Sequence, residues 1–358
     1  MNAKERYLSV FDDEKRKRLD RVPTFVQYIR SEFTELHRKK FENMRLPFHS
    51  DVSRFTEAYF MGFESVFGNV HPGLRVSQVE VEDEKGENVL VAWNGQPPAK
   101  KLGYYKRGLF FSIENLDKVW ETMRKVDDSV EIKKTMDHFD RISPYIFPVI
   151  AVGGIFDTLW QSMGFNNFSY HHRKNSKLYR ELIKYFAELT LIRVQSIIDA
   201  TRSRAGVINI LDDIAFKGRS MISPERWEQD IGKYYKEICS IIIDAGMKTQ
   251  LHSDGEVTDM VPILKRIGFN GVQGWEGGAD PFIVNENHPD FVIIGFGDIS
   301  QVIPYGSKED IFNHMKELMI ALKEDRHFII GPSTVIYEGI PYENVEYFVE
   351  ASRHYGKY

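Results

Sequence analysis

A histidine and two carboxylates stand at the ends of two neighbouring β-like runs in the sequence. His252 and Asp254 follow the run at 247–251, and Glu276 follows the run at 271–274. Imidazole nitrogens and carboxylate oxygens bind divalent metal ions, and the same groups act as general acids and bases. We therefore treat His252, Asp254 and Glu276 as candidate catalytic residues and as a candidate metal-binding set.

Other β-like runs are also followed by residues that could act in catalysis or bind a substrate. Asp212 and Asp213 come directly after the run at 207–211, and they are further candidate catalytic residues. The candidate substrate-binding residues, at or just past other run ends, are Tyr28, Arg30, Gly154, Trp275 and Asp298. If all these runs are strands of one parallel barrel, their ends meet at a single mouth, where such barrels carry their active sites.

Each candidate also has an ordinary structural explanation. Asp212 or Asp213 would cap a helix or bind backbone amides of the next loop. Asp254 would be a turn residue in Ser-Asp-Gly. His252 would be a histidine at the barrel rim with its hydrogen bonds satisfied.

Eight short apolar runs alternate with helical patterns along the chain. The strands that we expect are 22–27, 64–70, 147–152, 207–211, 247–251, 271–274, 291–296 and 327–330. This rhythm indicates an α/β protein, and eight such strands are typical of a (β/α)8, or TIM, barrel. A doubly wound open sheet is the alternative, but it usually carries a glycine-rich phosphate turn after its first strand, and none is present there.

One segment, 76–110, interrupts this rhythm. Its first part alternates apolar and polar residues around Lys85-Gly86 and predicts a β-hairpin, whereas Pro97-Pro98 indicates an irregular continuation. We therefore expect one barrel domain over 1–358 with an excursion after the second strand. The expected helices are 4–18 as a charged surface helix, 31–45, 116–126, 175–204 and a helix from Ser223-Pro224 to Gly246.

Composition narrows the class of protein. Hydrophobic residues make up 42% of the chain and charged residues 28%, as in soluble globular proteins, and the net charge of −5 gives no reason to expect nucleic-acid binding. The single cysteine, Cys239, rules out an intrachain disulfide and a cysteine-rich zinc site. The charged N-terminus resembles no signal peptide, and no apolar run is long enough to span a membrane. We expect a soluble cytoplasmic protein that could form a homodimer.

Several short motifs, taken in their order and spacing, resemble the uroporphyrinogen decarboxylase superfamily. They are Asp20-Arg21-Val22-Pro23, Asp212-Asp213 with Ile222-Ser223-Pro224-Glu225, Leu251-His252-Ser253-Asp254-Gly255, Pro304-Tyr305-Gly306-Ser307 and Pro341-Tyr342-Glu343-Asn344. Within the superfamily the chain is similar to the cobalamin- and corrinoid-dependent methyltransferases. The resemblance covers nearly the whole chain and implies a TIM barrel with its active site at the C-terminal mouth.

The chain departs from those methyltransferases at the metal site. They typically hold zinc with a His-x-Cys-Gly turn and a later cysteine. Here His252 matches the histidine, Asp254 stands at the first cysteine position, and the second falls near Ser333 or Thr334. A thiolate zinc site is therefore excluded, and the resemblance leaves an oxygen-rich site of His252, Asp254 and Glu276 for zinc or another divalent ion.

The chain departs from true uroporphyrinogen decarboxylases as well. Those enzymes carry an Arg-Gln-Ala-Gly-Arg segment after the first strand, which holds the carboxylates of the substrate. This chain has Gln27-Tyr28-Ile29-Arg30 there, with one arginine. A substrate with eight carboxylates is therefore a poor match.

The sequence leaves three functions open. The first is methyl transfer from a methylated or methoxylated small molecule to a corrinoid, which is free or carried by a partner protein. The second is a metal-free decarboxylase or lyase on a small acidic or tetrapyrrole-like substrate, with Arg30 holding the anion and His252 as the acid. The third is a barrel that binds a ligand without turnover.

Overall fold

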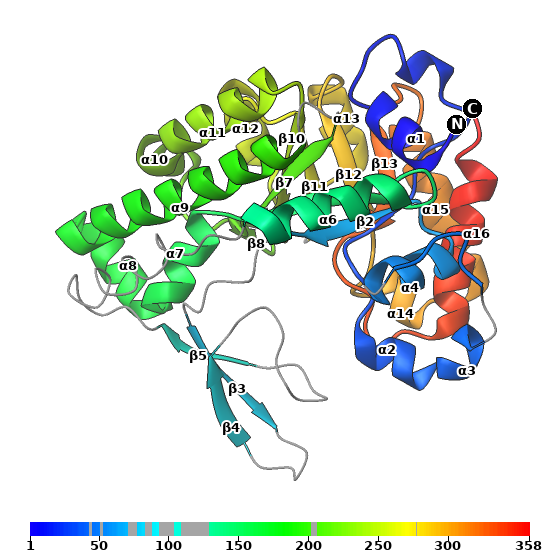
Figure 1. Cartoon of the computed structure of the whole chain (residues 1–358), viewed down its shortest axis with the longest axis horizontal. Helices are drawn as coiled ribbons and strands as arrows, with labels where there is room; N and C mark the ends of the chain where they lie inside the picture. Colours follow the sequence, from blue (N-terminus) through cyan, green and yellow to red (C-terminus); the bar gives the residue numbers. More distant parts are fainter. Residues whose placement is uncertain are drawn as a thin grey trace.

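The computed structural model spans the 358-residue chain, and its fold is shown in Figure 1. The structure describes residues 1–42, 45–50, 53–70, 77–82, 88–92, 104–108, 129–201, 206–276 and 278–358. Among these residues no helix is long and apolar enough to cross a membrane.

Eight parallel strands form the centre of the molecule. They are β1 (Phe25–Val26), β2 (Ser65–Asn69), β6 (Phe147–Gly153), β7 (Val207–Leu211), β10 (Lys248–Ser253), β11 (Gly271–Gly274), β12 (Val292–Gly297) and β13 (Phe328–Pro332). Each pairs with the next in this order, and a parallel bridge between Thr24 and Ile330 joins the last strand to the first. The expected (β/α)8 barrel is therefore confirmed, and a doubly wound open sheet is excluded.

The strands are apolar because both of their faces are buried. One face fills the inside of the barrel with side chains such as Phe25, Phe67 and Ile294. The other face, with Ile208 and Ile293 among its residues, packs against the helices. Strands covered on both faces read as continuous apolar runs, which is why the sequence pattern located all eight.

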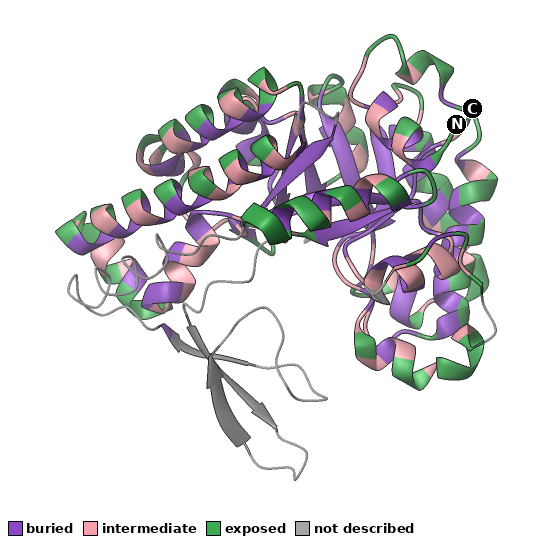
Figure 2. Ribbon diagram, in the orientation of Figure 1, coloured by how far each residue is buried: buried purple, intermediate pink, exposed green. Residues whose placement is uncertain are grey.

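Helices surround the barrel and turn their buried sides toward it, as the burial colours in Figure 2 show. They are α2 (Ser31–Leu36), α3 (Arg38–Phe41), α4 (Ser53–Met61), α6 (Ser129–Ile142), α7 (Phe156–Met163), α8 (Phe165–Lys174), α9 (Lys177–Thr201), α10 (Pro224–Trp227), α11 (Lys233–Asp244), α12 (Val261–Ile267), α13 (Pro281–Asn287), α14 (Val302–Tyr305), α15 (Lys308–Leu322) and α16 (Tyr342–Tyr355). The long helix expected at 175–204 is present as α9. The helix expected at 31–45 is wrong in its extent, because α2 ends at Leu36 and a separate short helix, α3, follows.

The expected helix start at Ser223-Pro224 is confirmed, because the Ser223 side chain accepts a hydrogen bond from the backbone N–H of Arg226. The helix does not run uniformly to Gly246. A π-helical turn, η2 (Glu228–Gly232), separates α10 from α11. The helical spacing of the buried residues gives no signal for this change of turn.

The N-terminal segment corrects another expectation. A charged surface helix over 4–18 is wrong: the structure has α1 (Ala3–Ser9) and a separate 3-10 turn, η1 (Arg16–Arg18). The Tyr7 ring is 1% exposed and lies 5.2 Å from the ring of Phe147, and its hydroxyl donates to Gln250 Oε1 at 2.8 Å. Phe147 begins β6, so α1 covers the N-terminal end of the barrel, opposite the mouth.

The excursion is a three-stranded antiparallel sheet in the order β4-β3-β5, with β3 (Ser77–Glu82), β4 (Asn88–Ala92) and β5 (Tyr104–Gly108). The predicted hairpin is confirmed in its two strands, β3 and β4, whereas its Lys85-Gly86 turn and the helix expected at 116–126 lie outside the described residues. β5 was not expected, because the prolines before it indicated an irregular segment. The sheet stands away from the barrel and far from the two chain ends (Figure 1). It meets α7 at Gly108, where a Cβ would lie 2.1 Å from the carbonyl oxygen of Ser162.

The closure of the barrel by α1 is testable. Replacing Tyr7 by Phe leaves Gln250 Oε1 without its donor inside the barrel, and a buried acceptor without a partner costs about 1–3 kcal/mol. We expect the free energy of unfolding in urea to fall by about that amount. Tyr170 is 59% exposed, and the matched control Tyr170→Phe should leave the stability unchanged. Equal stabilities of Tyr7→Phe and the wild type would contradict this account.

Candidate functional site

Three of the candidate residues meet at the ends of β7 and β10. The two strands are parallel, with His252 opposite Leu211 in their register. Asp213 and Asp254 are each two residues further along, so they lie at the same height above the strands. Because side chains alternate along a strand, Asp213, His252 and Asp254 all face the inside of the barrel.

These three side chains form a compact cluster. His252 Nε2 lies 3.7 Å from Asp213 Oδ1 and 3.7 Å from Asp254 Oδ1. One nitrogen or oxygen atom of each residue lies within 4.8 Å of the others, a spacing that allows all three to bind one metal ion. Asp213 Oδ1 also accepts a hydrogen bond from the backbone N–H of Asp254 at 2.9 Å, which holds the two loops together.

Asp254 Oδ1 is the atom that most needs a ligand. It is buried and lacks a hydrogen-bond partner among the described residues, although the Asp254 side chain as a whole keeps 39% of its exposure. A buried carboxylate oxygen without a partner is costly unless a proton, a water molecule or a cation satisfies it. The residues present therefore fit a divalent cation.

The charges around the cluster are mostly negative. Burial raises the pKa of the Asp254 carboxyl to about 7; His252 acts against this shift, and Asp213 and Glu276 add to it. Burial, with the charges of Asp213 and Asp212, also holds the pKa of the Asp157 carboxyl well above its usual range. None of the ion pairs found in the described part of the chain joins a lysine or arginine to any of these carboxylates. The mouth therefore favours a cation over an anion.

Gln273 orients the His252 ring through the Nδ1 atom. His252 is 5% exposed, and its Nδ1 lies 2.5 Å from Gln273 Oε1 on the neighbouring strand β11. The amide nitrogen of Gln273 donates in turn to the carbonyl oxygen of Ser333 at 2.9 Å. Such a partner on the far nitrogen fixes the ring and directs the other nitrogen toward the site.

The expected third metal ligand, Glu276, is not part of this compact cluster. Its Oε1 accepts a hydrogen bond from the Ser333 hydroxyl at 2.8 Å, and its charge raises the pKa of Asp254. Asp213 takes its place in the cluster. Glu276 is thus a carboxylate beside the cluster, held by the end of β13.

Trp275 packs in the hydrophobic core beside the site and offers no free polar group. It is 4% exposed, its indole N–H donates to the carbonyl of Val272 at 3.0 Å, and its ring stacks on Phe296 at 5.3 Å. Both residues have a positive φ, at 70° and 65°, which side-chain-bearing residues seldom adopt. Such backbone strain is found most often beside functional sites.

Asp212 and Gly154 lie behind the site and not in it. Asp212 is completely buried on the helix-facing side, where it accepts hydrogen bonds from the Asp157 backbone N–H and the Tyr235 hydroxyl, both at 2.6 Å. A Cβ on Gly154 would lie 2.4 Å from Asp212 Cβ. In place of the catalytic and substrate-binding roles expected for them, this geometry gives Asp212 and Gly154 the task of anchoring the start of α7.

The remaining substrate-binding candidates stand at the rim. Asp298 Oδ1 accepts from the backbone N–H groups of Ser300 and Gln301, both at 2.8 Å, as an aspartate in a turn does. Tyr28 and Arg30 flank Ile29, which forms a parallel bridge with Ile336 beyond β13. Among the described residues, Tyr28, Arg30 and Asp298 make no hydrogen bond or ion pair with the cluster.

Sequence reasoning missed two glutamines that contact His252, Gln27 and Gln273, and one carboxylate that interacts with Asp213 and Asp254, Asp157. Gln27 and Gln273 are buried, at 7% and 0% exposure, and each lies against one nitrogen of the His252 ring. Their signal in the sequence is a glutamine at an inward-facing position of an otherwise apolar strand. Asp157 follows the Gly153-Gly154 turn and accepts two hydrogen bonds from Gln161 at 2.8 Å.

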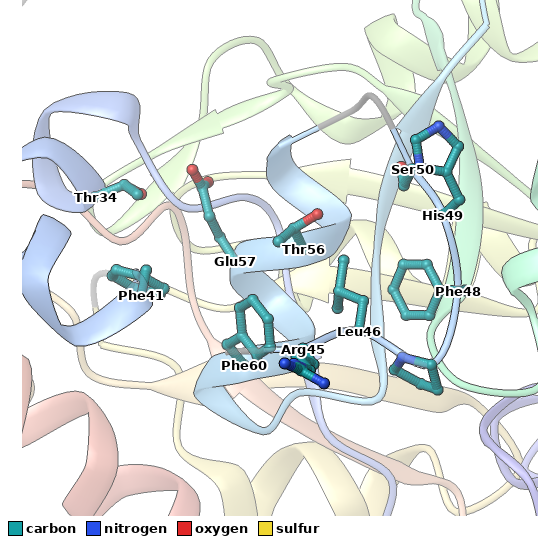
Figure 3. A pocket seen from close by; sticks show the side chains of 11 residues that line it. Thr34, Phe41, Arg45, Leu46, Phe48, His49, Ser50, Thr56, Glu57 and Phe60 are labelled. Carbon is teal, nitrogen blue, oxygen red and sulfur yellow. The ribbon is translucent and has the colours of Figure 1, made fainter. Parts of the chain in front are cut away.

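A large cavity, of about 870 Å³, lies elsewhere, between α2, α3 and α4 (Figure 3). Glu57 and Thr34 line it together with Phe41 and Phe60. Glu57 is 6% exposed, and burial raises the pKa of its carboxyl to about 6. None of the residues of the His252 cluster lines this cavity, so it is separate from the candidate site.

Comparisons with known proteins support the fold and place the chain among relatives. The family model described as uroporphyrinogen decarboxylase (URO-D) matches residues 110–355. A methyltransferase from Methanosarcina mazei superimposes with a TM-score of 0.68 at 16% identity, covering 99% of both chains. A putative vitamin-B12-independent methionine synthase from Listeria monocytogenes gives a TM-score of 0.42 at 13% identity, covering 94% of this chain and 96% of that one. No curated protein matches by sequence.

The buried Asp212 predicts how stability depends on pH. Burial raises the pKa of its carboxyl to about 7 in the folded protein, against about 3.9 in an unfolded chain. The folded state therefore binds this proton more tightly, and Asp212 makes the free energy of unfolding fall as the pH rises from about 4 to about 7. Asp212→Asn keeps an acceptor for the Asp157 N–H and should make this decline shallower, by up to about 1.4 kcal/mol per pH unit.

Urea unfolding at intervals across this pH range measures the decline. The exposed Asp259 offers a control, and Asp259→Asn should keep the wild-type dependence. An Asp212→Asn protein with the same pH dependence as the wild type would show that Asp212 is ionised throughout.

Proposed function

The chain belongs to the uroporphyrinogen decarboxylase family, and from this premise we propose that it is an enzyme that transfers a methyl group from a methylated or methoxylated small molecule to a corrinoid. The observation that carries the proposal is the cluster of His252, Asp213 and Asp254 at the mouth of the barrel. The overall likeness to a methyltransferase supports it. The corrinoid would be free or held by a partner protein.

In this proposal His252 Nε2 and the carboxylates of Asp213 and Asp254 hold a divalent cation, with zinc as the first choice. Such an ion would act as a Lewis acid toward an oxygen or nitrogen atom of a methylated donor. Gln273 fixes the His252 ring, and the Asp254 N–H fixes the Asp213 carboxylate. The ligands are therefore oriented by the protein before a cation or a donor arrives.

Glu276 is the carboxylate available to move a proton. The Ser333 hydroxyl holds its Oε1, and no hydrogen bond among the described residues engages its Oε2. When the methyl group leaves, the oxygen or nitrogen atom that carried it needs a proton, and Glu276 Oε2 would supply it. General acid catalysis of this kind contributes typically about 10²–10⁴-fold in rate.

The charges at the mouth argue against a small acidic substrate. The carboxylates of Asp157, Asp213, Asp254 and Glu276 interact electrostatically in and beside the cluster where such a substrate would sit, and the described residues give them no lysine or arginine partner. An anionic substrate would meet like charges, which cost free energy in a partly buried site. Arg30 at the rim does not offset them.

The metal content of the purified protein tests the cation part of the proposal. Protein prepared without chelator should carry about one divalent ion per chain, and His252→Ala should carry less than about 0.1, because two carboxylates alone bind such ions weakly. Elemental analysis of dialysed protein provides the measurement. His354 is exposed, and the control His354→Ala should keep the wild-type content. A low content in the wild type as well would remove the metal from the proposal.

The role of Glu276 is tested by methyl transfer to cob(I)alamin from a panel of methoxylated aromatics and methylated amines. The wild type should form methylcobalamin with at least one donor. Glu276→Gln keeps the acceptor for Ser333 and removes the acid, so kcat should fall by roughly 10²-fold or more with little change in KM. Donor binding without turnover in the wild type would instead indicate a binding protein.

A further inference from the structure

The hydrogen bonds around His252 determine which of its ring nitrogens carries a proton. The Gln273 amide nitrogen donates to the Ser333 carbonyl oxygen, which can only accept. The other end of that amide, Oε1, therefore faces His252 Nδ1, and this oxygen can also only accept. His252 Nδ1 must carry the hydrogen, so the neutral ring keeps its lone pair on Nε2.

That lone pair already has a partner. Gln27 Nε2 lies 3.0 Å from His252 Nε2, and Gln27 is 7% exposed at the end of β1. An amide nitrogen donates, so Gln27 gives an N–H to the Nε2 lone pair. At its other end Gln27 Oε1 accepts from the Thr334 hydroxyl at 3.0 Å. The chain Thr334, Gln27, His252, Gln273, Ser333 thus has one consistent direction of donation.

The two glutamines have opposite consequences for a cation. Gln273 holds the far side of the ring and favours Nε2 as a ligand. Gln27 occupies the same lone pair that a metal ion needs, on the side where Asp213 and Asp254 approach within 3.7 Å. A cation can bind Nε2 only after the Gln27 amide has withdrawn from it.

We propose that Gln27 is a gate on the metal site: its amide competes with the divalent cation for His252 Nε2 and thereby lowers the affinity of the site. The proposal rests on the metal site proposed above. Because the competitor is a neutral amide, it costs every cation the same buried hydrogen bond. An ion that binds imidazole strongly, such as zinc, still enters despite this cost.

The experiment compares the affinity for Zn²⁺ alone in four proteins, by competition with a chromophoric chelator. Gln27→Leu removes the competing donor in a side chain of similar size, and the affinity should rise by roughly tenfold. Gln273→Leu removes the anchor on Nδ1, and the affinity should fall by roughly tenfold or more, as loss of such a partner usually causes. Thr334→Val should raise the Zn²⁺ affinity less than Gln27→Leu does. It removes the hydroxyl that holds Gln27 Oε1, and the Gln27 amide nitrogen can still donate to His252.

Opposite changes at the two glutamines are the signature of the gate, since a merely structural loss would weaken binding in both variants. Should Gln27→Leu fail to fold by circular dichroism, Thr334→Val carries the same test from the rim of the barrel. Equal Zn²⁺ affinities in the wild type, Gln27→Leu and Thr334→Val would overturn the gate and leave the metal site standing. Absence of Zn²⁺ binding in all four proteins would overturn the metal site and the gate together.

Nitrogen-15 spectra of the His252 ring provide a check that needs no metal. The wild type should show a protonated Nδ1 and an unprotonated Nε2 that accepts a hydrogen bond, and only the Nε2 signal should move in Gln27→Leu. A protonated Nε2 on the neutral ring would overturn the proposal.

Discussion

The register in which β7 lies beside β10 is the constraint on which the site depends. His252 pairs with Leu211. The next inward-facing residues that follow these two strands are therefore Asp213 and Asp254, at the same height. A slip of one residue would turn Asp213 outward and bring Asp212 inward. The apolar outward face of β7 resists that slip, because it would move buried isoleucines from the helix layer into the barrel.

Burial and charge then give this geometry its chemical character. The mouth gathers carboxylates that the protein does not neutralise with lysine or arginine in its described parts, and burial raises the pKa of Asp254 and Asp157. Such a site is stabilised by a cation. Helix α1 closes the opposite end of the barrel through the buried Tyr7 and its hydrogen bond to Gln250. A ligand therefore reaches the inside of the barrel from the mouth.

The sequence predicted the barrel well because each strand is buried on two faces and reads as an apolar run; β7 begins and ends where its run does, at Val207–Leu211. The sequence could not tell that Asp213 faces the inside of the barrel and Asp212 the helices. The alternation of side chains along a strand assigns these directions only when one inward-facing residue is already known. Gln27 and Gln273 were missed for the same reason: a buried glutamine looks like an ordinary polar residue until the barrel closes around it. His252 and Asp254 were chosen because they follow one β-like run, and the structure places both on the inward face because neighbours on the same face of a strand are two residues apart.

Anomalous diffraction from crystals grown with Zn²⁺ tests the central claim most directly. The account predicts a peak within bonding distance of His252 Nε2 and of one oxygen each from Asp213 and Asp254, with the Gln27 amide moved away from the ring. A structure in Zn²⁺ without a peak there, in which Gln27 still donates to His252 Nε2, would contradict the account.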